Sequence, residues 1–225
     1  MIETEEMNET INAGSLSFSK PLRALAQLVS WLAHPLFVPA IFAGILLFVH
    51  PINQLMIPYP VRIRIMAMVG INTVLFPGLL AFLLYRLGFM KSIYMESQKD
   101  RIIPLVVGIM FYFWAFYVGR NLDVIPPSLQ QWLLGVFLCS CAAMFTNIWK
   151  KISLHGIGMG GAITFCAWQQ ATDTHWPSFL LIPVLIIGGL VGTARLIRGA
   201  HDPSDIYAGY LAGAICQVAA GIVML

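Results

Sequence analysis

Long apolar runs restrict this sequence to few folds. Runs near the roughly 20 residues that cross a bilayer core cover about 22–50, 63–87, 102–118, 129–149, 153–172, 177–194 and 204–225. They are continuous instead of alternating, and only 10% of the chain is charged, where a soluble domain carries about a quarter. Continuous apolar segments satisfy their backbone in lipid only as helices. The sequence therefore predicts an all-α integral membrane protein, a bundle of six to seven transmembrane helices.

The first run is the one that leaves the count of crossings open. It contains His34-Pro35 and Pro39, so we expect a kinked or broken helix, and six crossings plus an interfacial helix is the alternative. Residues 1–20 are polar and acidic, without the pattern of a secretory signal peptide. We expect a polar tail over 1–20 and a single transmembrane domain over 21–225.

Several classes of function are disfavoured by composition. A net charge of +3 without a basic stripe gives no reason to expect a nucleic-acid partner. The cysteines lie in apolar runs without zinc-like spacing, and no carboxylate cluster suggests a metal. We therefore predict no metal and no cofactor. Of the histidines outside the polar clusters, His34 is expected to hydrogen bond inside the bundle, and His50 and His175 to lie in loops.

Three polar clusters are expected on one side of the membrane. The loops at 88–101, 150–154 and 195–202 are separated by two predicted crossings each. An even number of crossings returns the chain to the same side. The sequence thus predicts one active site at one membrane face.

The cluster at 195–205 carries the most chemistry. His201 and Asp205 are four residues apart, and Pro203 favours a helix start between them, which brings the two side chains onto one face. A carboxylate that holds one imidazole nitrogen leaves the other free as a nucleophile. Arg195 supplies positive charge for an anion.

The other two clusters have groups that suit an anion. Ser153, His155 and Gly156 follow Lys150-Lys151 at a predicted helix start, where a hydroxyl and backbone N–H groups bind anions and a histidine can donate a proton. Lys99 and Arg101 precede the third run. An N-cap serine and interfacial basic residues are the structural alternatives.

The order of these clusters resembles the type 2 phosphatidic acid phosphatase superfamily, which includes bacterial acid phosphatases and vanadium haloperoxidases. Its motifs are Lys-x6-Arg-Pro, Pro-Ser-Gly-His and Ser-Arg-x5-His-x3-Asp. Here the third is matched from Arg195 through His201 to Asp205, with Ala194 in place of its serine. The resemblance covers about residues 91–213.

The other two motifs depart further from the pattern. Ser153 and His155 match the second motif, with Ile152 and Leu154 in place of proline and glycine. Two isoleucines separate Arg101 from Pro104 in the first motif, and Tyr94 stands where its lysine is expected. Either Lys91 or Lys99 takes the lysine role.

The resemblance implies a role for each matched residue. His201 would be the nucleophile, Asp205 would orient it, and His155 would be the general acid and then the base. The phosphate oxygens would be held by Arg195, Arg101, Lys99 and Ser153, with backbone N–H groups at Gly156. Such a site needs fixed charges around the phosphoryl group more than a metal.

The expected function is a membrane lipid phosphatase that acts on a lipid phosphate mono- or diphosphate ester through a phosphohistidine. Phosphatidate, phosphatidylglycerophosphate, polyprenyl diphosphates and a lipid A-like phosphate are all open as substrates. The alternatives are a phosphotransferase with the same site and a non-catalytic lipid or anion transporter. We expect a multi-pass protein of a cell membrane, as in a bacterial inner membrane, and the oligomeric state stays open.

Two arguments give opposite orientations. Of the 13 Lys and Arg residues, ten fall on the face predicted for the site and three on the other. The positive-inside rule then places the site in the cytoplasm. The resemblance implies an outer or periplasmic site. Both orientations remain open at the level of sequence.

Overall fold

The first apolar run is broken, as its prolines predicted. In the computed structural model, which describes residues 18–89 and 97–225, this run forms α2 (Lys20–Leu32), α3 (Val38–Phe48) and α4 (Pro51–Met56). A proline disfavours helical backbone in the residue before it, and α2 ends just ahead of His34-Pro35. With 13 and 11 residues, neither α2 nor α3 is long enough to cross a bilayer core alone. Residues 1–17 of the predicted tail and Lys91 lie outside the described residues.

The second run is one long helical segment with a local irregularity. It consists of α5 (Tyr59–Gly70), the π-helical turn η1 (Ile71–Leu75) and α6 (Phe76–Arg86). Pro77 is the second residue after the π turn. Since proline has no N–H to donate to the preceding turn, a π turn at this point absorbs the missing hydrogen bond without ending the helix.

The rest of the chain forms long helices joined by short turns. They are α7 (Gln98–Arg120), α8 (Pro127–Asn147), α9 (Leu154–Thr172), α10 (Leu181–Ile197), entered through the 3-10 turn η2 (Ser178–Leu180), and α11 (Pro203–Val223). Within the described residues, five helical segments are long and apolar enough to cross a membrane: 59–86, 98–120, 127–147, 178–197 and 203–223. The sequence predicted six to seven, so the first run and α9 account for the difference.

Helix α9 lies inside the bundle, which explains its lower hydropathy. It has 19 residues, nine of them buried, and it packs on α8, α10 and α11. Near its end, the Gln169 amide donates to Gln131 Oε1 of α8 at 3.0 Å. A polar side chain is tolerated at this depth because a protein partner satisfies it.

Glycines bring α9 and α11 into close contact. A Cβ atom on Gly209 would lie 2.7 Å from the Ser153 carbonyl oxygen, and one on Gly156 would lie 2.9 Å from the carbonyl oxygen of Ile206. Farther along, Gly160 faces the backbone of Tyr210 in the same way. The two helices that carry most of the polar clusters are therefore held backbone to backbone.

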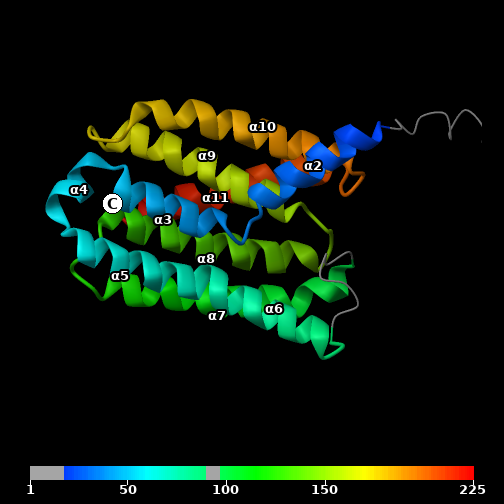
Figure 1. Cartoon of the computed structure of the whole chain (residues 1–225), viewed down its shortest axis with the longest axis horizontal. Coiled ribbons are helices and arrows are strands. Elements are labelled where there is room, and N and C mark those ends of the chain that lie inside the picture. Colours follow the sequence, from blue (N-terminus) through cyan, green and yellow to red (C-terminus); the bar gives the residue numbers. More distant parts are fainter. Residues whose placement is uncertain (1–17, 90–96) are drawn as a thin grey trace, which may run out of the picture.

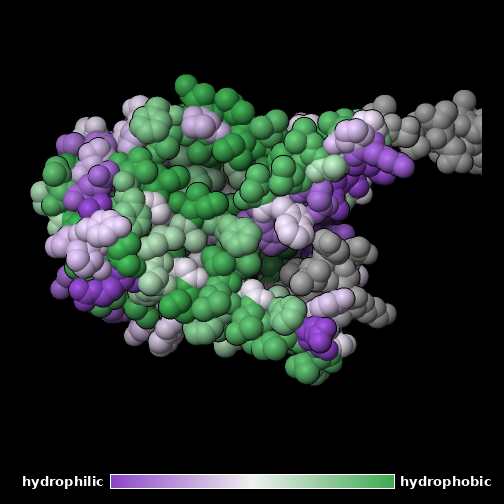
Figure 2. Space-filling view, in the orientation of Figure 1, coloured by the Kyte–Doolittle hydropathy of each residue, from purple (hydrophilic) through white to green (hydrophobic). Residues whose placement is uncertain are grey.

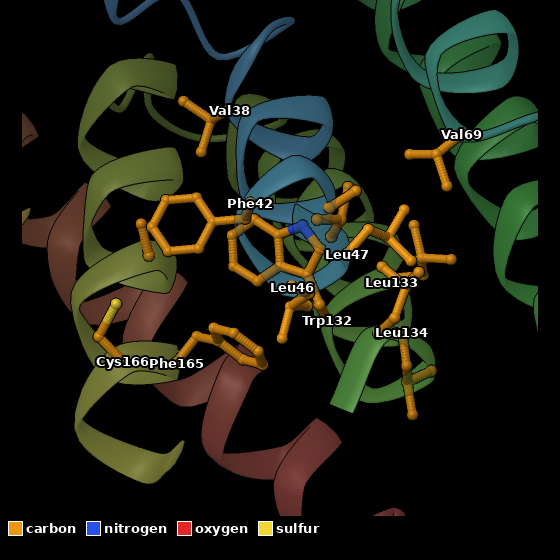
Figure 3. Packing of buried hydrophobic residues seen from close by; sticks show 14 of the residues in the cluster. Val38, Phe42, Leu46, Leu47, Val69, Trp132, Leu133, Leu134, Phe165 and Cys166 are labelled. Atoms are coloured by element: carbon orange, nitrogen blue, oxygen red, sulfur yellow. The ribbon is translucent and has the colours of Figure 1, made fainter. Parts of the chain in front are cut away.

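Aromatic side chains tie α3 to the bundle (Figure 3). Phe42 of α3 stacks on Trp132 of α8 with ring centroids 4.6 Å apart, and Trp132 in turn lies 5.0 Å from Phe165 of α9. The Trp132 indole N–H donates to the Pro39 carbonyl at 3.0 Å. A buried indole needs such a partner, so this bond fixes α3 in register against α8.

The polar loops gather at the two ends of the bundle (Figure 1). One end holds α2, the end of α6, the start of α7 and the turns α8–α9 and α10–α11; α4 lies at the other. At that other end His50 is only 4% exposed, and its Nε2 atom lies 2.8 Å from Asp173 Oδ2. The prediction of His50 as a loop residue is confirmed, since it lies in the turn between α3 and α4 as the N-cap of α4. Its contact with Asp173 joins this turn to the one after α9.

Candidate functional site

His201 and Asp205 face each other at the start of α11. Pro203 is the first residue of this helix, as the sequence predicted, and Asp202 is its N-cap. His201 Nδ1 lies 3.5 Å from Asp205 Oδ2, and the side chains are only 2% and 13% exposed. A carboxylate beside Nδ1 favours the tautomer with its proton on that atom. The lone pair of the neutral ring is then on Nε2.

A lysine that the sequence did not single out binds the same carboxylate. Lys150 Nζ lies 2.8 Å from Asp205 Oδ1 and donates to Ser204 Oγ at 2.9 Å. Since the Lys150 side chain is 54% exposed, the pair contributes little to stability. Its effect is geometric, because Asp205 is held from one side by Lys150 while its other oxygen faces His201.

Ser153 and Gly156 build the junction between α9 and α11. Ser153 is fully buried, its Oγ caps α9 by accepting from the Gly156 N–H at 3.2 Å, and its own N–H donates to the Asp205 carbonyl at 3.1 Å. The Gly156 amide, predicted to face an anion, is thus used in the cap. The cluster around Ser153 and the cluster around His201 are thus joined through their backbones.

Arg101 connects the cluster at 88–101 to the cluster at 150–154. It is 5% exposed, in the first turns of α7, and its Nη1 donates to the Ile152 carbonyl at 2.9 Å. Ile152 immediately precedes Ser153, so a contact across 51 residues joins the clusters. Lys99, two residues earlier, is exposed; among the contacts of the described residues, none ties it to this group.

Arg195 lies at the centre of the charges. It is in the last turn of α10, and its charge acts on Arg101, His34, His155 and His201. Its Nε atom is buried without a hydrogen-bond partner among the described residues. A buried donor in that state costs free energy unless a ligand satisfies it.

His155 is held by a helix that the motifs did not include. Its Nε2 atom lies 3.0 Å from the Ser30 carbonyl oxygen of α2, a contact across 125 residues. Because a carbonyl only accepts, Nε2 carries the proton and Nδ1 is the free nitrogen of the neutral ring. The ring also meets His34 edge to face, with centroids 5.5 Å apart. His34 Nδ1 accepts from the Leu36 N–H at 3.2 Å, the internal hydrogen bond expected for it.

Burial and nearby positive charge keep His34 and His201 neutral. The pKa of His201 is lowered to about 4 by burial and then by the charges of Arg101, Arg195 and Lys151, against the opposing effect of Asp205. The pKa of His34 is lowered by burial and by Arg195. A neutral His201 at pH 7 is the form a nucleophile requires.

Hydrophilic surface lies along α2 at this end of the molecule, and hydrophobic surface covers the middle (Figure 2). Nearer the middle of the molecule, an open groove of about 280 Å³ runs between α9, α10 and α11. It is lined mainly by apolar atoms, from residues that include Gly160, Ile163, Gly189, Tyr210 and Ala214.

The described residues define a class but not a family. Helices that can cross a bilayer and a cluster of buried charge at one end of the bundle are features of a multi-pass membrane protein. Comparison of the chain with family models, curated proteins and solved structures returned no match. No group of three or more His, Cys, Asp or Glu side chains with metal-binding geometry occurs in residues 18–89 and 97–225.

Proposed function

We propose that this protein is a membrane lipid phosphatase that hydrolyses a phosphate mono- or diphosphate ester of a lipid through a phosphohistidine intermediate, without a metal ion. One observation carries the proposal. Arg101, Arg195 and His155, from three distant parts of the chain, converge on the buried pair His201 and Asp205. The Nε donor of Arg195 is buried there without a hydrogen-bond partner among the described residues, which costs free energy, and a phosphate oxygen would satisfy it.

In the first step His201 attacks. The Nε2 lone pair forms a bond to phosphorus, while the bond from phosphorus to the lipid oxygen breaks. The Nδ1 proton stays on the ring, and the Asp205 carboxylate 3.5 Å away stabilises the positive charge that forms. For this step His155 must be doubly protonated, a form that a bound phosphate anion stabilises. The departing oxygen takes the proton from Nδ1, while Nε2 keeps its proton in the hydrogen bond to Ser30, and the ring is left neutral.

In the second step water replaces the histidine. The neutral Nδ1 of His155 accepts a proton from water as its oxygen attacks phosphorus. The phosphorus–nitrogen bond breaks, its electron pair returns to His201 Nε2, and inorganic phosphate leaves. Arg101 and Arg195, together with Lys151, supply the positive charge that stabilises the non-bridging oxygens in both transition states.

The surroundings of the cluster favour a lipid as substrate. Gly160 follows His155 by five residues and Gly189 precedes Arg195 by six, so the groove starts about 8 Å along the helices from the charges. A hydrocarbon chain in this apolar groove would place the head group of the same molecule at the polar end. We propose a cell membrane, such as a bacterial inner membrane, as the location.

Phosphate release in detergent micelles tests the proposal. Wild type should release phosphate from at least one of phosphatidate, phosphatidylglycerophosphate, a polyprenyl diphosphate or a lipid A-like phosphate, and His201→Ala should lose this by a factor of about 10³ or more. Equal release from both proteins would refute an enzymatic role for His201. Full activity in EDTA, inhibition by vanadate and acid-labile bound phosphate are expected of this mechanism. Transfer of phosphate to an added alcohol in place of water would identify a phosphotransferase.

A transporter is the second candidate, and the polar cluster argues against it. His201, Asp205 and Arg195 lie at helix ends. The substrate site of a transporter is instead expected near the middle of the membrane. Binding of lipid phosphate by His201→Ala without its hydrolysis would support a nucleophile. Transport of the lipid by that variant at the wild-type rate would support the transporter.

A further inference from the structure

Helix α2 has an apolar face that no described part of the protein covers. We call the residues Leu25, Leu28, Trp31 and Leu32 the apolar stripe of α2; they recur at helical spacing and are 56%, 54%, 62% and 68% exposed. The opposite side of the helix is buried through Ala26 and Ser30. Four large apolar side chains on one exposed helix face are typical of an interaction surface.

The lipid bilayer is the partner that this face fits. Helix α2 packs against α10, one of the segments able to cross the membrane, so its exposed side looks outward from the bundle into the region that lipid occupies. Tryptophan is enriched at the membrane–water boundary. Lys20 and Arg23 stand at the N-terminal end of α2 and are exposed, which suits an anionic lipid surface.

The buried side of the same helix reaches the candidate site. The Ser30 carbonyl accepts from His155 Nε2 at 3.0 Å, and the chain directly after α2 places His34 against the His155 ring. Ser30 is 3% exposed. The same short stretch of α2 therefore carries the apolar stripe on one side and the hydrogen-bond acceptor of His155 on the other.

We propose that contact between the lipid surface and the apolar stripe of α2 holds Ser30 against His155, so that membrane binding by this helix positions the general acid. Ser30 and His34 are then positioning groups, since they act through His155. The catalytic consequence rests on the function proposed above, whereas the lipid contact and the seating of His155 do not. Loss of the contact frees the His155 ring to rotate.

Fluorescence in nanodiscs tests the lipid contact. Brominated phospholipids should quench a component of the tryptophan emission that is present in wild type and missing from Trp31→Phe. Equal quenching of the two proteins would overturn the proposal, because Trp31 would then be out of contact with lipid. This measurement does not depend on any enzymatic activity.

Chemical modification tests the link to His155. In nanodiscs, diethylpyrocarbonate should modify His155 roughly fivefold faster in Leu25→Gln/Leu32→Gln than in wild type, as expected for the loss of one hydrogen bond of about 1 kcal/mol. Leu55→Gln/Met56→Gln is the matched control, since these side chains are 76% and 72% exposed at the far end of the bundle. Modification of the buried His50 in the same samples reports whether the bundle is intact.

The outcomes separate this inference from the proposed function. An unchanged His155 rate in the stripe variant, with His50 protected, would overturn the coupling. Faster modification of both histidines would also overturn it, because the bundle itself would have loosened. If the stripe variant behaves as expected and also lowers kcat for lipid phosphate while the control does not, both proposals gain support. If wild type releases no phosphate but the modification result holds, the function fails and the positioning stands.

Discussion

Asp205 has two partners that compete for its carboxylate, and the balance between them sets the state of His201. One oxygen lies 2.8 Å from Lys150 and the other 3.5 Å from His201. The shorter contact is with an exposed lysine, whose attraction is screened by water. The longer contact is buried, where a carboxylate has the larger effect on the charge that forms on the imidazole.

The role of Asp205 is tested by a change that keeps its shape. Asp205→Asn should lower kcat by a factor of about 10² or more, because the ring loses the group that orients it and stabilises its positive form. Asp202→Asn is the matched control: it is the exposed N-cap of the same helix and its side chain makes no cap hydrogen bond. Phosphate release by the two variants, measured side by side, decides. Equal losses would show that charge near the helix start, not the His201 contact, is responsible.

The pKa of His201 gives a prediction for acid conditions. Its pKa is about 4 in the folded protein, lowered by burial and by neighbouring arginines from 6.5. Above pH 6.5 the ring is neutral in both the folded and unfolded states. Between pH 6.5 and about 4 the ring takes up a proton in the unfolded state and not in the folded state. Proton uptake therefore favours the unfolded state, and the free energy of unfolding decreases as the pH falls through this range. Above pH 6.5 this loss of stability is absent.

Unfolding in detergent at several pH values checks that prediction. The stability of wild type relative to His201→Gln should decrease as the pH is lowered from 6.5 to 4, and should be constant above 6.5. An NMR titration of the ring should give a midpoint well below 6.5. A constant difference in stability across the acid range would contradict the lowered pKa.

At this scale the sequence predicted some contacts and missed others for a physical reason. The pair His201 and Asp205 is local, four residues apart on one helix, and spacing is enough to find it. The contact of Ser30 with His155 spans 125 residues and uses a backbone carbonyl, which every residue has. No side-chain pattern marks such a group. Lys150 was visible as a charge, but its partner depended on how α9 meets α11.

At the scale of helices, the α9–α11 contact should be intolerant of side chains. Gly213→Ala places a Cβ atom 2.6 Å from the backbone nitrogen of Gly161. We expect a loss of about 1–3 kcal/mol of stability, since backbone atoms cannot move aside as a flexible side chain can. Gly189→Ala is the control, because a Cβ atom there meets nothing within 4 Å. Thermal unfolding in one detergent compares them, and equal transition temperatures would contradict the packing.

The groove between α9, α10 and α11 can be filled without touching the charges. Gly189→Leu adds a side chain where the space is open. If a substrate chain occupies the groove, the rate for dipalmitoyl phosphatidate should fall about tenfold or more, while dihexanoyl phosphatidate, with short chains, should be hydrolysed nearly as before.

Gly70→Leu makes the same change at another open helical position, in α5. It should leave the ratio of the two rates unchanged. A loss of both activities in Gly189→Leu would point to a change of structure, and no loss of either would mean that the groove is not used by these lipids.

For whole helices, the sequence predicted the bounds of lipid-facing segments better than those of segments that pack against other parts of the protein. The segments 98–120 and 178–197 match the predicted runs 102–118 and 177–194 to within four residues at each end, since a lipid-facing helix must be apolar along its length. The first run is equally apolar but is broken at His34-Pro35 and divided between α2 and α3. Hydropathy shows where a chain avoids water and does not show where it turns.

The arrangement of the whole molecule depends on whether α9 crosses the membrane. Its 19 residues extend about 28 Å, close to the thickness of a bilayer core. It joins the end of the bundle with the polar cluster to the end with His50 and Asp173 (Figure 1). Since α8, α10 and α11 cover it, it can cross with two glutamines in its last turns. We therefore expect a crossing that hydropathy alone does not identify.

Cysteine labelling from each side of sealed vesicles tests this arrangement. Trp149→Cys and Thr174→Cys are exposed positions before and after α9, and a membrane-impermeant maleimide should reach them from opposite sides. The unsubstituted chain gives the background from its four native cysteines. Asp123→Cys, in the turn between α7 and α8, should be labelled from the same side as Thr174→Cys. Labelling of Trp149→Cys and Thr174→Cys from one side would mean that α9 enters and returns, and the polar cluster would then lack the shared face on which the proposed chemistry depends.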